Sequence, residues 1–236
     1  PGRKDNTLTI GNRWVWTAQS TWNPVGGFSD VYSNDIWQNI HDPSLWRDPF
    51  TGIPVPFRAS YEVLTAGPKG MLDLPRDAFR WDAQNGLFTT VEAGTSATSK
   101  VIFDYSNYFQ SKWHHGQPIT MADAVYSLFH TFDLVYNEDK SRIEFALATT
   151  GKPFLDTIRG FRIVDENRLE VYVDYWHFID DYIAEYASIP SLTMPWEIRL
   201  AMDQLVFQDR RAAYSDTAAQ RFQVPWLSLV MDNDTR

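Results

Sequence analysis

The stretch SKWHHGQPITMADAVYSLF, Ser111–Phe129, places two adjacent histidines ahead of a turn and a run of apolar residues. Thr120 followed by Asp123 has the form of a helix start. A Thr hydroxyl at the N-cap accepts a free backbone N–H, and an acid three positions later reaches back to the cap. Apolar residues then recur at helical spacing, at Val125, Leu128, Phe129, Phe132 and Val135. The stretch predicts a turn at residues 116–118 and a helix with one buried face.

His114 and His115 could belong to a metal or catalytic site, or to the turn itself. A helical zinc site needs histidines four residues apart with a further ligand, and no H-E-x-x-H pattern is present. Adjacent residues of an extended chain point to opposite sides, so the two rings cannot easily share one ion. We therefore expect a structural turn, with no metal and no catalytic residue.

Composition narrows the function classes. The 236 residues carry a formal net charge of −9, which argues against binding to nucleic acid or anionic membrane, although a local basic patch is compatible with it. There is no cysteine, so disulfides, thiolate metal ligands and cysteine nucleophiles are excluded. The chain is rich in aromatic residues, which supply buried area and, where exposed, stacking surfaces. No apolar run has the length of a membrane span.

Strand and helix patterns alternate along the chain and predict an α/β protein of mixed α+β type with antiparallel strand pairs. The clearest element is a hairpin in FRIVDENRLEVYVDY, turning at residues 165–167. The expected strands cover residues 7–18, 59–64, 86–93 and 100–106, and the expected helices cover residues 31–40, 177–187 and 195–222.

The opening stretch resembles a signature of one family, K-W-x-D-G-x-P-L/V-T-A-x-D-V-x-x-S. The family is the large peptide- and nickel-binding class of extracellular solute-binding proteins of ABC transporters (solute-binding protein family 5). The matching positions are Lys112, Trp113, Gly116, Pro118, Thr120, Asp123, Val125 and Ser127. His115 stands where the family usually has Asp. If that Asp caps the turn, His115 could do so only through a neutral ring nitrogen, which would make local stability mildly pH-dependent.

Three further segments are similar to the family's in the same order. They are TWNPVGGFSDVYSNDIWQNIHDPSL, in which Asn23-Pro24 stands for the usual D/N-P, TGIPVPFRASYEV, and VDENRLEVYV. Together with the signature they span roughly residues 7–195. Four matches in order are more specific than any one of them.

The resemblance implies a type II periplasmic-binding-protein clamshell, in which ligand is trapped between two lobes and delivered to the permease. On this reading residues 1–236 are chiefly the first lobe, and the second lobe and the returning C-terminal segment are absent. The implied protein is not an enzyme and needs no cofactor. It is extracellular, periplasmic or anchored at the cell surface, with any membrane anchor outside this stretch.

The resemblance also implies a ligand site in the loop after the first strand, where backbone can pair with an extended peptide. The predicted ligand-binding residues are Trp22, Asn23, Gly26, Gly27, Phe28 and Ser29. The alternative is that this segment is a plain surface turn.

Other functions stay open at this point. The aromatic content keeps an oligosaccharide beside a peptide as the ligand, and an isolated lobe could bind neither tightly. A glycoside hydrolase would need two carboxylates flanking the scissile bond, and the densest acidic cluster is Asp180, Asp181 and Glu185. Those residues also fit the solvated face of an amphipathic helix.

Overall fold

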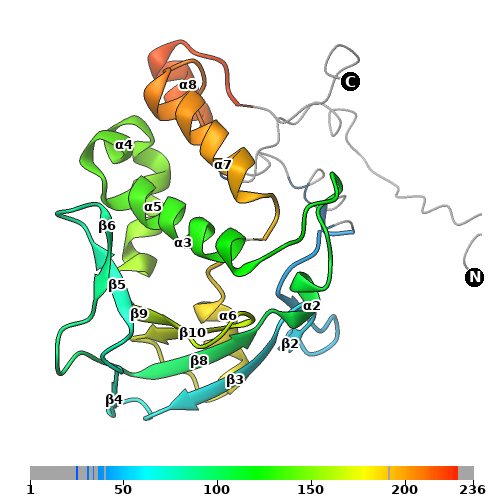
Figure 1. Cartoon of the computed structure of the whole chain (residues 1–236), viewed down its shortest axis with the longest axis vertical. Coiled ribbons are helices and arrows are strands. Elements are labelled where there is room, and N and C mark those ends of the chain that lie inside the picture. The colour runs from blue at the N-terminus through cyan, green and yellow to red at the C-terminus, as the bar shows by residue number, and fades with distance from the viewer. Residues whose placement is uncertain are drawn as a thin grey trace, which may run out of the picture.

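A computed structural model of the chain describes residues 41–190 and 192–227, together with Val25, Val31, Asn34 and residues 37–39. Its base is a six-stranded antiparallel sheet, and helices cover one face of that sheet (Figure 1). The strand order is β3-β8-β10-β9-β5-β6. The predicted mixed α+β class is confirmed at this level.

The main sheet contains β3 (Ser60–Thr65), β5 (Phe79–Asp82), β6 (Leu87–Thr90), β8 (Ser99–Asp104), β9 (Ile158–Ile163) and β10 (Arg168–Val173). Two small sheets pair β1 (Leu45–Arg47) with β2 (Pro54–Pro56) and β4 (Leu72–Asp73) with β7 (Ser96–Ala97). The helices are α2 (Ser106–Phe109), α3 (Met121–Tyr136), α4 (Glu138–Ile143), α5 (Phe145–Leu155), α6 (Asp180–Ala187), α7 (Trp196–Asp203), the π-helix η2 (Gln204–Gln208) and α8 (Asp216–Phe222).

The predicted hairpin is confirmed as β9 and β10, whose register places Leu169 opposite Ile163. Leu169, Val171 and Val173 are fully buried beneath the helices, as the alternation predicts. The polar side of the strand is covered as well. Tyr172 packs in a second, smaller core with residues such as Leu74, and its hydroxyl donates to Glu170 at 2.5 Å.

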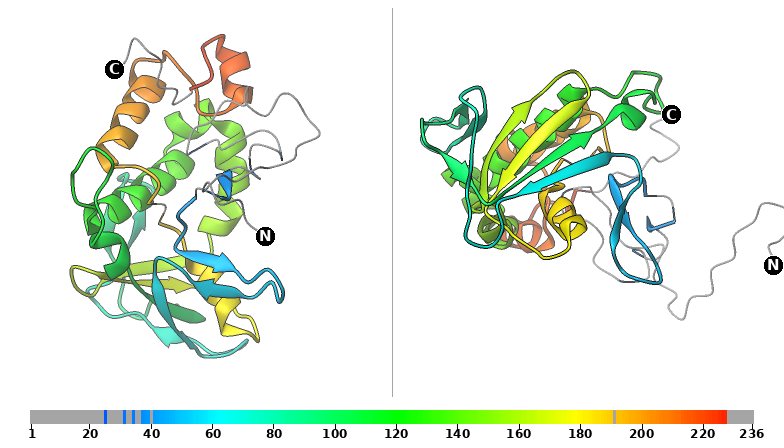
Figure 2. Two further views of the ribbon diagram at one scale, coloured as in Figure 1. Left: turned by 90° about the vertical axis from the view of Figure 1, so that its right-hand side faces the viewer. Right: turned by 90° about the horizontal axis from the view of Figure 1, so that it is seen from below.

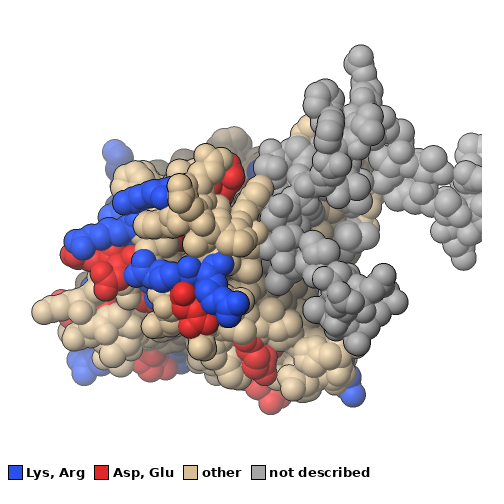
Figure 3. All heavy atoms as spheres, turned by 90° about the horizontal axis from the view of Figure 1, so that it is seen from above, with Lys and Arg blue, Asp and Glu red and all other residues tan. Residues whose placement is uncertain are grey.

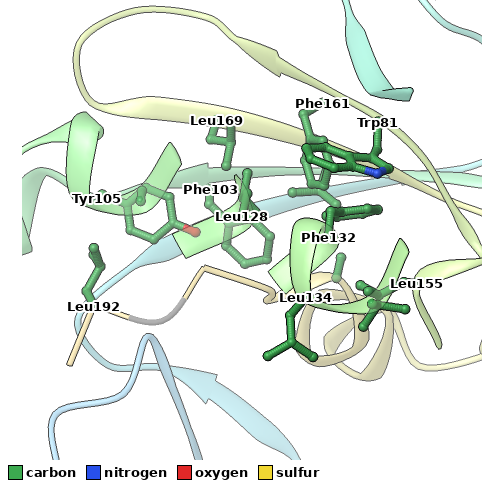
Figure 4. Close-up of a cluster of buried hydrophobic side chains, with 14 of the residues drawn as sticks. Trp81, Phe103, Tyr105, Leu128, Phe132, Leu134, Leu155, Phe161, Leu169 and Leu192 are labelled. Carbon is green, nitrogen blue, oxygen red and sulfur yellow. The ribbon is translucent and has the colours of Figure 1, made fainter. Parts of the chain in front are cut away.

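Helix α3 supplies the centre of the main core. Leu128 and Phe132 face the sheet, and Phe103 and Phe161 meet them from β8 and β9 (Figure 4). Trp81 of β5 closes one end of this cluster, with its ring centroid 6.1 Å from that of Phe132. The buried apolar area of such aromatic contacts is the main favourable term in folding.

Helix α6 and the β1–β2 hairpin lie together at the β3 edge of the sheet (Figure 2). The guanidinium of Arg47 on β1 joins them, because it donates to both carboxylate oxygens of Glu185 on α6, at 2.6 and 2.7 Å. On the face above the helices, basic and acidic side chains are interspersed over the part of the chain that the structure describes (Figure 3). Within the described residues, no helix has the length and apolar character needed to cross a membrane.

The prediction of one helical region from Pro195 to Phe222 is wrong in its middle. Helix α7 widens into η2, and the chain then leaves helical geometry over residues 209–215. Arg210 adopts a positive φ of 56°, a conformation that ends a helix. Ser215 starts α8 anew by accepting the Ala218 N–H on its hydroxyl at 3.1 Å.

Two other predicted elements fall partly or wholly outside the described residues. The opening strand over residues 7–18 lies entirely outside them. Within the helix predicted over residues 31–40, the described Val31, Asn34 and Trp37 are helical.

Candidate functional site

The signature stretch folds as a tight turn that leads into α3. Lys112 and Pro118 face each other in an antiparallel bridge, and the Trp113 N–H donates to the Gln117 carbonyl at 2.8 Å. The Gly116 N–H donates to the Trp113 carbonyl at 2.8 Å. Gly116 has a φ of 97°, which is favourable for glycine and strained for residues with a Cβ atom. The histidine pair therefore lies in a turn, as predicted, but the turn spans residues 113–116 rather than the expected 116–118.

His114 and His115 are exposed on the tip of this turn. The structure gives the His115 ring no hydrogen bond to another described residue, so it does not act as the cap of the turn. Among the described residues, no group of three or more His, Cys, Asp or Glu side chains is placed to hold a metal ion.

Asp123 is buried and joins the starts of two helices. Its Oδ2 accepts the Thr120 N–H at 2.8 Å, which completes the predicted cap of α3. Its Oδ1 accepts the backbone N–H of Trp196, the first residue of α7, at 3.1 Å. The second bond could not be predicted from the sequence, because it links residues that are 73 positions apart.

The structure holds a crevice of about 250 Å³ at the C-terminal end of α6, which we call the α6 crevice. The segment 41–45 lines one part of it, and Glu185 with Ser188, Ile189, Pro190, Leu192 and Thr193 lines another. Tyr108 of α2 also lines it. A small concave site with apolar walls and a few fixed polar groups is typical of ligand binding.

Polar contacts fix the wall that carries Asp42. The Tyr108 hydroxyl donates to the Asp42 carbonyl at 2.6 Å, and burial raises the pKa of Tyr108 to about 12. The Arg58 guanidinium lies 4.9 Å from the centre of the Tyr108 ring and donates through Nη2 to Ser111 at 2.8 Å. The crevice is thereby tied to the first residue of the signature stretch.

His41 brings a titratable group to the crevice. Its ring stacks on Trp37 with centroids 5.1 Å apart, and burial lowers its pKa below the ordinary value. The imidazole is therefore neutral at pH 7 and offers one donor and one acceptor to a ligand.

The predicted ligand residues Trp22, Asn23, Gly26, Gly27, Phe28 and Ser29 lie outside the described residues. Val25, in the middle of that segment, is described. It occupies a turn, is half-buried and packs against the main core. The α6 crevice was not predicted, because its walls come from segments about 65 to 150 residues apart that carry no common pattern.

Two of the three acidic residues on α6 make hydrogen bonds to side chains of neighbouring strands. The Tyr61 hydroxyl donates to Asp181 at 2.6 Å, and Glu185 binds Arg47 through both oxygens. Burial, followed by the bond to Asp181, raises the pKa of Tyr61. The alternative that this cluster belongs to the solvated face of α6 fits Asp180, which is exposed, whereas Asp181 and Glu185 are half-buried and bonded to Tyr61 and Arg47.

A buried polar network joins α3 to α7 and the segment before α8. His130 Nδ1 lies 3.0 Å from the Asp203 carboxylate, and the Tyr214 hydroxyl donates to the same carboxylate at 2.8 Å. Burial lowers the pKa of His130, so its ring is neutral at pH 7. Asp203 is ionised: burial opposes its charge, but the donors His130 and Tyr214 hold its pKa below the ordinary value. His130 Nε2 has no hydrogen-bond partner among the described residues. In a catalytic triad this nitrogen would bond the nucleophile, and no described residue takes that place.

Glu144 is the most deeply buried carboxylate that the structure describes, with no exposed surface. It accepts the backbone N–H groups of Tyr214 and Ser215 at 2.7 and 3.1 Å and the Ser215 hydroxyl at 2.6 Å. Burial raises its pKa, and these donors oppose the increase. Its position makes it a structural clamp between α5 and the start of α8.

Known proteins add no assignment to these observations. A comparison with models of known protein families finds no match, and no curated protein matches the chain.

Proposed function

We propose that this chain is the first lobe of an extracellular solute-binding protein that captures oligopeptides or dipeptides and delivers them to the permease of an ABC importer. On this proposal the lobe belongs to a type II clamshell and acts outside the cell, in the periplasm or anchored at the cell surface. It performs no chemical step on its ligand.

The observation that carries the proposal is that residues matching the family signature have structural roles in the turn and the helix start. Gly116 occupies the positive-φ turn position, and Thr120 with Asp123 forms the helix cap. Asp123 also bonds the start of α7. The residues that carry the resemblance thus have definite structural tasks at their observed spacing, which supports a common architecture over a chance match of letters.

The α6 crevice supports a binding function. It combines apolar walls at Ile189 and Leu192 with the neutral imidazole of His41 and the phenol of Tyr108. His41, which lines the crevice, lies 12 residues after Ser29, the last of the predicted ligand residues. An extended peptide could place one side chain in the crevice.

A thermal-shift titration tests the proposal. The panel contains trialanine, a mixed tripeptide library and maltotriose, each added to the 236-residue chain and to any longer natural form of the protein. Ligand at a hundred times Kd should add about 2.7 kcal/mol to the free energy of unfolding. Stabilisation by peptides alone supports the peptide assignment, whereas stabilisation by maltotriose alone reassigns the ligand to an oligosaccharide.

Two histidine variants locate the site. His41→Ala removes a crevice side chain and should weaken peptide binding at least threefold. His177→Ala is the matched control, because His177 lies outside the crevice and bonds the backbone of Ile179. Equal effects of the two variants, or the absence of stabilisation with every ligand of the panel, would contradict the proposal.

A further inference from the structure

A second cavity, of about 290 Å³, lies at the other end of the sheet, and we call it the β5 pocket. Its lining comes from β5, the turn after β6, the end of α3 and the start of β9. The α6 crevice lies beside β3, at the opposite edge of the strand order. The two cavities share no lining residue, so they are separate sites.

The inner wall of the β5 pocket is apolar and aromatic. It contains Trp81, Phe132, Tyr136 and Ile158. Trp81 is 8% exposed and stands edge-on to Phe129, with ring centroids 5.6 Å apart. In Figure 4 its indole nitrogen lies at the outer edge of the labelled cluster.

The Trp81 Nε1–H group is buried and has no hydrogen-bond partner among the residues that the structure describes. A buried donor without a partner costs about 1–3 kcal/mol, because water no longer satisfies it. The residue nevertheless lines the pocket, so its indole group lies next to whatever the pocket holds.

The carboxylates of the pocket are already engaged. Glu92 accepts Arg80 Nη2 at 2.6 Å. Asp156 accepts Lys152 Nζ at 2.6 and 2.9 Å and the Tyr136 hydroxyl at 2.8 Å. These bonds hold the Asp156 pKa below its ordinary value, so this carboxylate is not a free acid in the pocket.

Arg159 lines the pocket and has N–H groups that are not hydrogen-bonded to other described residues. Arg159 donates through Nε to the Ser96 carbonyl at 3.2 Å, and the same Nε lies 3.5 Å from Asp174. Neither Nη of Arg159 makes a hydrogen bond to another described residue. A guanidinium presents parallel N–H groups that match the two oxygens of a carboxylate.

We propose that the β5 pocket binds a small carboxylate with an aromatic or branched apolar body. The carboxylate would accept from the Arg159 Nη groups, and the ligand would lie beside the Trp81 indole. The apolar body would lie against Phe132 and Ile158. The volume is near the lower end for ligand pockets, which restricts the ligand to one ring or one short branched chain. This site is independent of the peptide-binding function proposed above.

Phenylacetate is a suitable probe, and the indole N–H signal of Trp81 reports its binding. In a two-dimensional nitrogen–proton spectrum of the whole chain, this signal is the one lost in Trp81→Phe. Titration with phenylacetate should shift it to saturation. Phenylacetamide keeps the shape without the charge and should bind at least tenfold more weakly. Inorganic phosphate keeps the charge without the apolar body and should also bind at least tenfold more weakly.

Calorimetry with two arginine variants keeps the test independent of the folding of Trp81→Phe. Arg159→Gln should weaken phenylacetate at least tenfold. Arg168→Gln makes the same change at an exposed arginine paired with Asp165, outside the pocket, and should leave the affinity unchanged. The proposal is overturned by the absence of saturable binding, by equal binding of phosphate, or by equal effects of the two variants.

Discussion

The carboxylate of Asp123 in the first turn of α3 accepts the backbone N–H of Trp196, which opens α7. The same carboxylate bonds the Thr120 N–H, so one buried side chain fixes the starts of two helices, although Asp123 and Trp196 are 73 residues apart. The free backbone amides at a helix start favour a negative charge, and here two such starts share it.

Replacing Asp123 should therefore destabilise the protein more than the loss of an ordinary cap. Asp123→Ala removes both bonds and should lower the free energy of unfolding by about 2.5–4 kcal/mol, since a cap contributes about 1 kcal/mol and a bond to a buried charged group about 1.5–3 kcal/mol. Urea denaturation measures the difference. Asp139→Ala is the matched control, an exposed acid in the first turn of α4, and should cost about 0.5 kcal/mol. Equal losses would show that the bond to Trp196 contributes nothing.

Glu144→Gln tests the clamp before α8. Three donors converge on this buried carboxylate, and an amide group would turn an N–H₂ toward one of them. The variant should lose about 2–4 kcal/mol of unfolding free energy, because a buried donor is left without an acceptor. Glu138→Gln, an exposed position paired with Arg142, should change stability by less than about 1 kcal/mol. A loss at Glu144 no larger than at Glu138 would contradict the clamp.

His130 should make stability pH-dependent. Its pKa is lowered in the folded state, so the unfolded chain binds a proton more readily below the unfolded value of about 6.5. The contribution of the neutral His130 to the free energy of unfolding is complete above that pH and is lost as the pH drops from about 7 to 5. The free energy of unfolding should fall by up to about 1.4 kcal/mol for each unit of pKa lowering. His130→Gln cannot titrate, so urea denaturation at pH 7 and pH 5 should show a smaller fall in the variant. An unchanged pH profile would mean that His130 keeps an ordinary pKa.

Tyr61 and Asp181 should be energetically coupled. Their bond of 2.6 Å joins β3 to α6, so a double-mutant cycle of Tyr61→Phe and Asp181→Asn should give a coupling energy of about 1–2 kcal/mol. The neighbouring Asp180→Asn should show no coupling to Tyr61→Phe. If Asp181→Asn instead abolished turnover of a glycoside substrate while leaving stability unchanged, the carboxylate would have a catalytic role and the structural assignment would fail.

Local patterns in the sequence predicted the elements that depend on neighbours in the chain. The α3 cap follows from Thr120 and Asp123 three positions apart, and the β9–β10 hairpin follows from strict alternation around the turn at residues 165–167. Other features depend on partners far away. The break before α8 follows from Glu144, 70 and 71 residues before the amides it binds. Residues 195–222 had a helical pattern. Nothing near them in the sequence indicated that a distant carboxylate would accept hydrogen bonds from their backbone N–H groups.

The same distinction applies to the site. The turn character of His114–His115 could be predicted, because Gly116 and Pro118 stand beside them. The α6 crevice could not, because His41, Tyr108 and Leu192 are far apart in the sequence and share no common pattern. The predicted ligand loop rested on the resemblance alone, and its residues lie outside those described.

The strand order β3-β8-β10-β9-β5-β6 also has a consequence for synthesis of the chain. The pairs β3–β8 and β5–β6 are complete by residue 104, yet only β9 and β10 connect them. A ribosome that has released only the first 150 residues therefore presents two strand pairs with open edges, and open edges invite pairing with other chains. The next 23 residues, 151–173, contain both β9, which pairs with β5, and β10, which pairs with β8, so the β9–β10 hairpin joins the two strand pairs when it emerges.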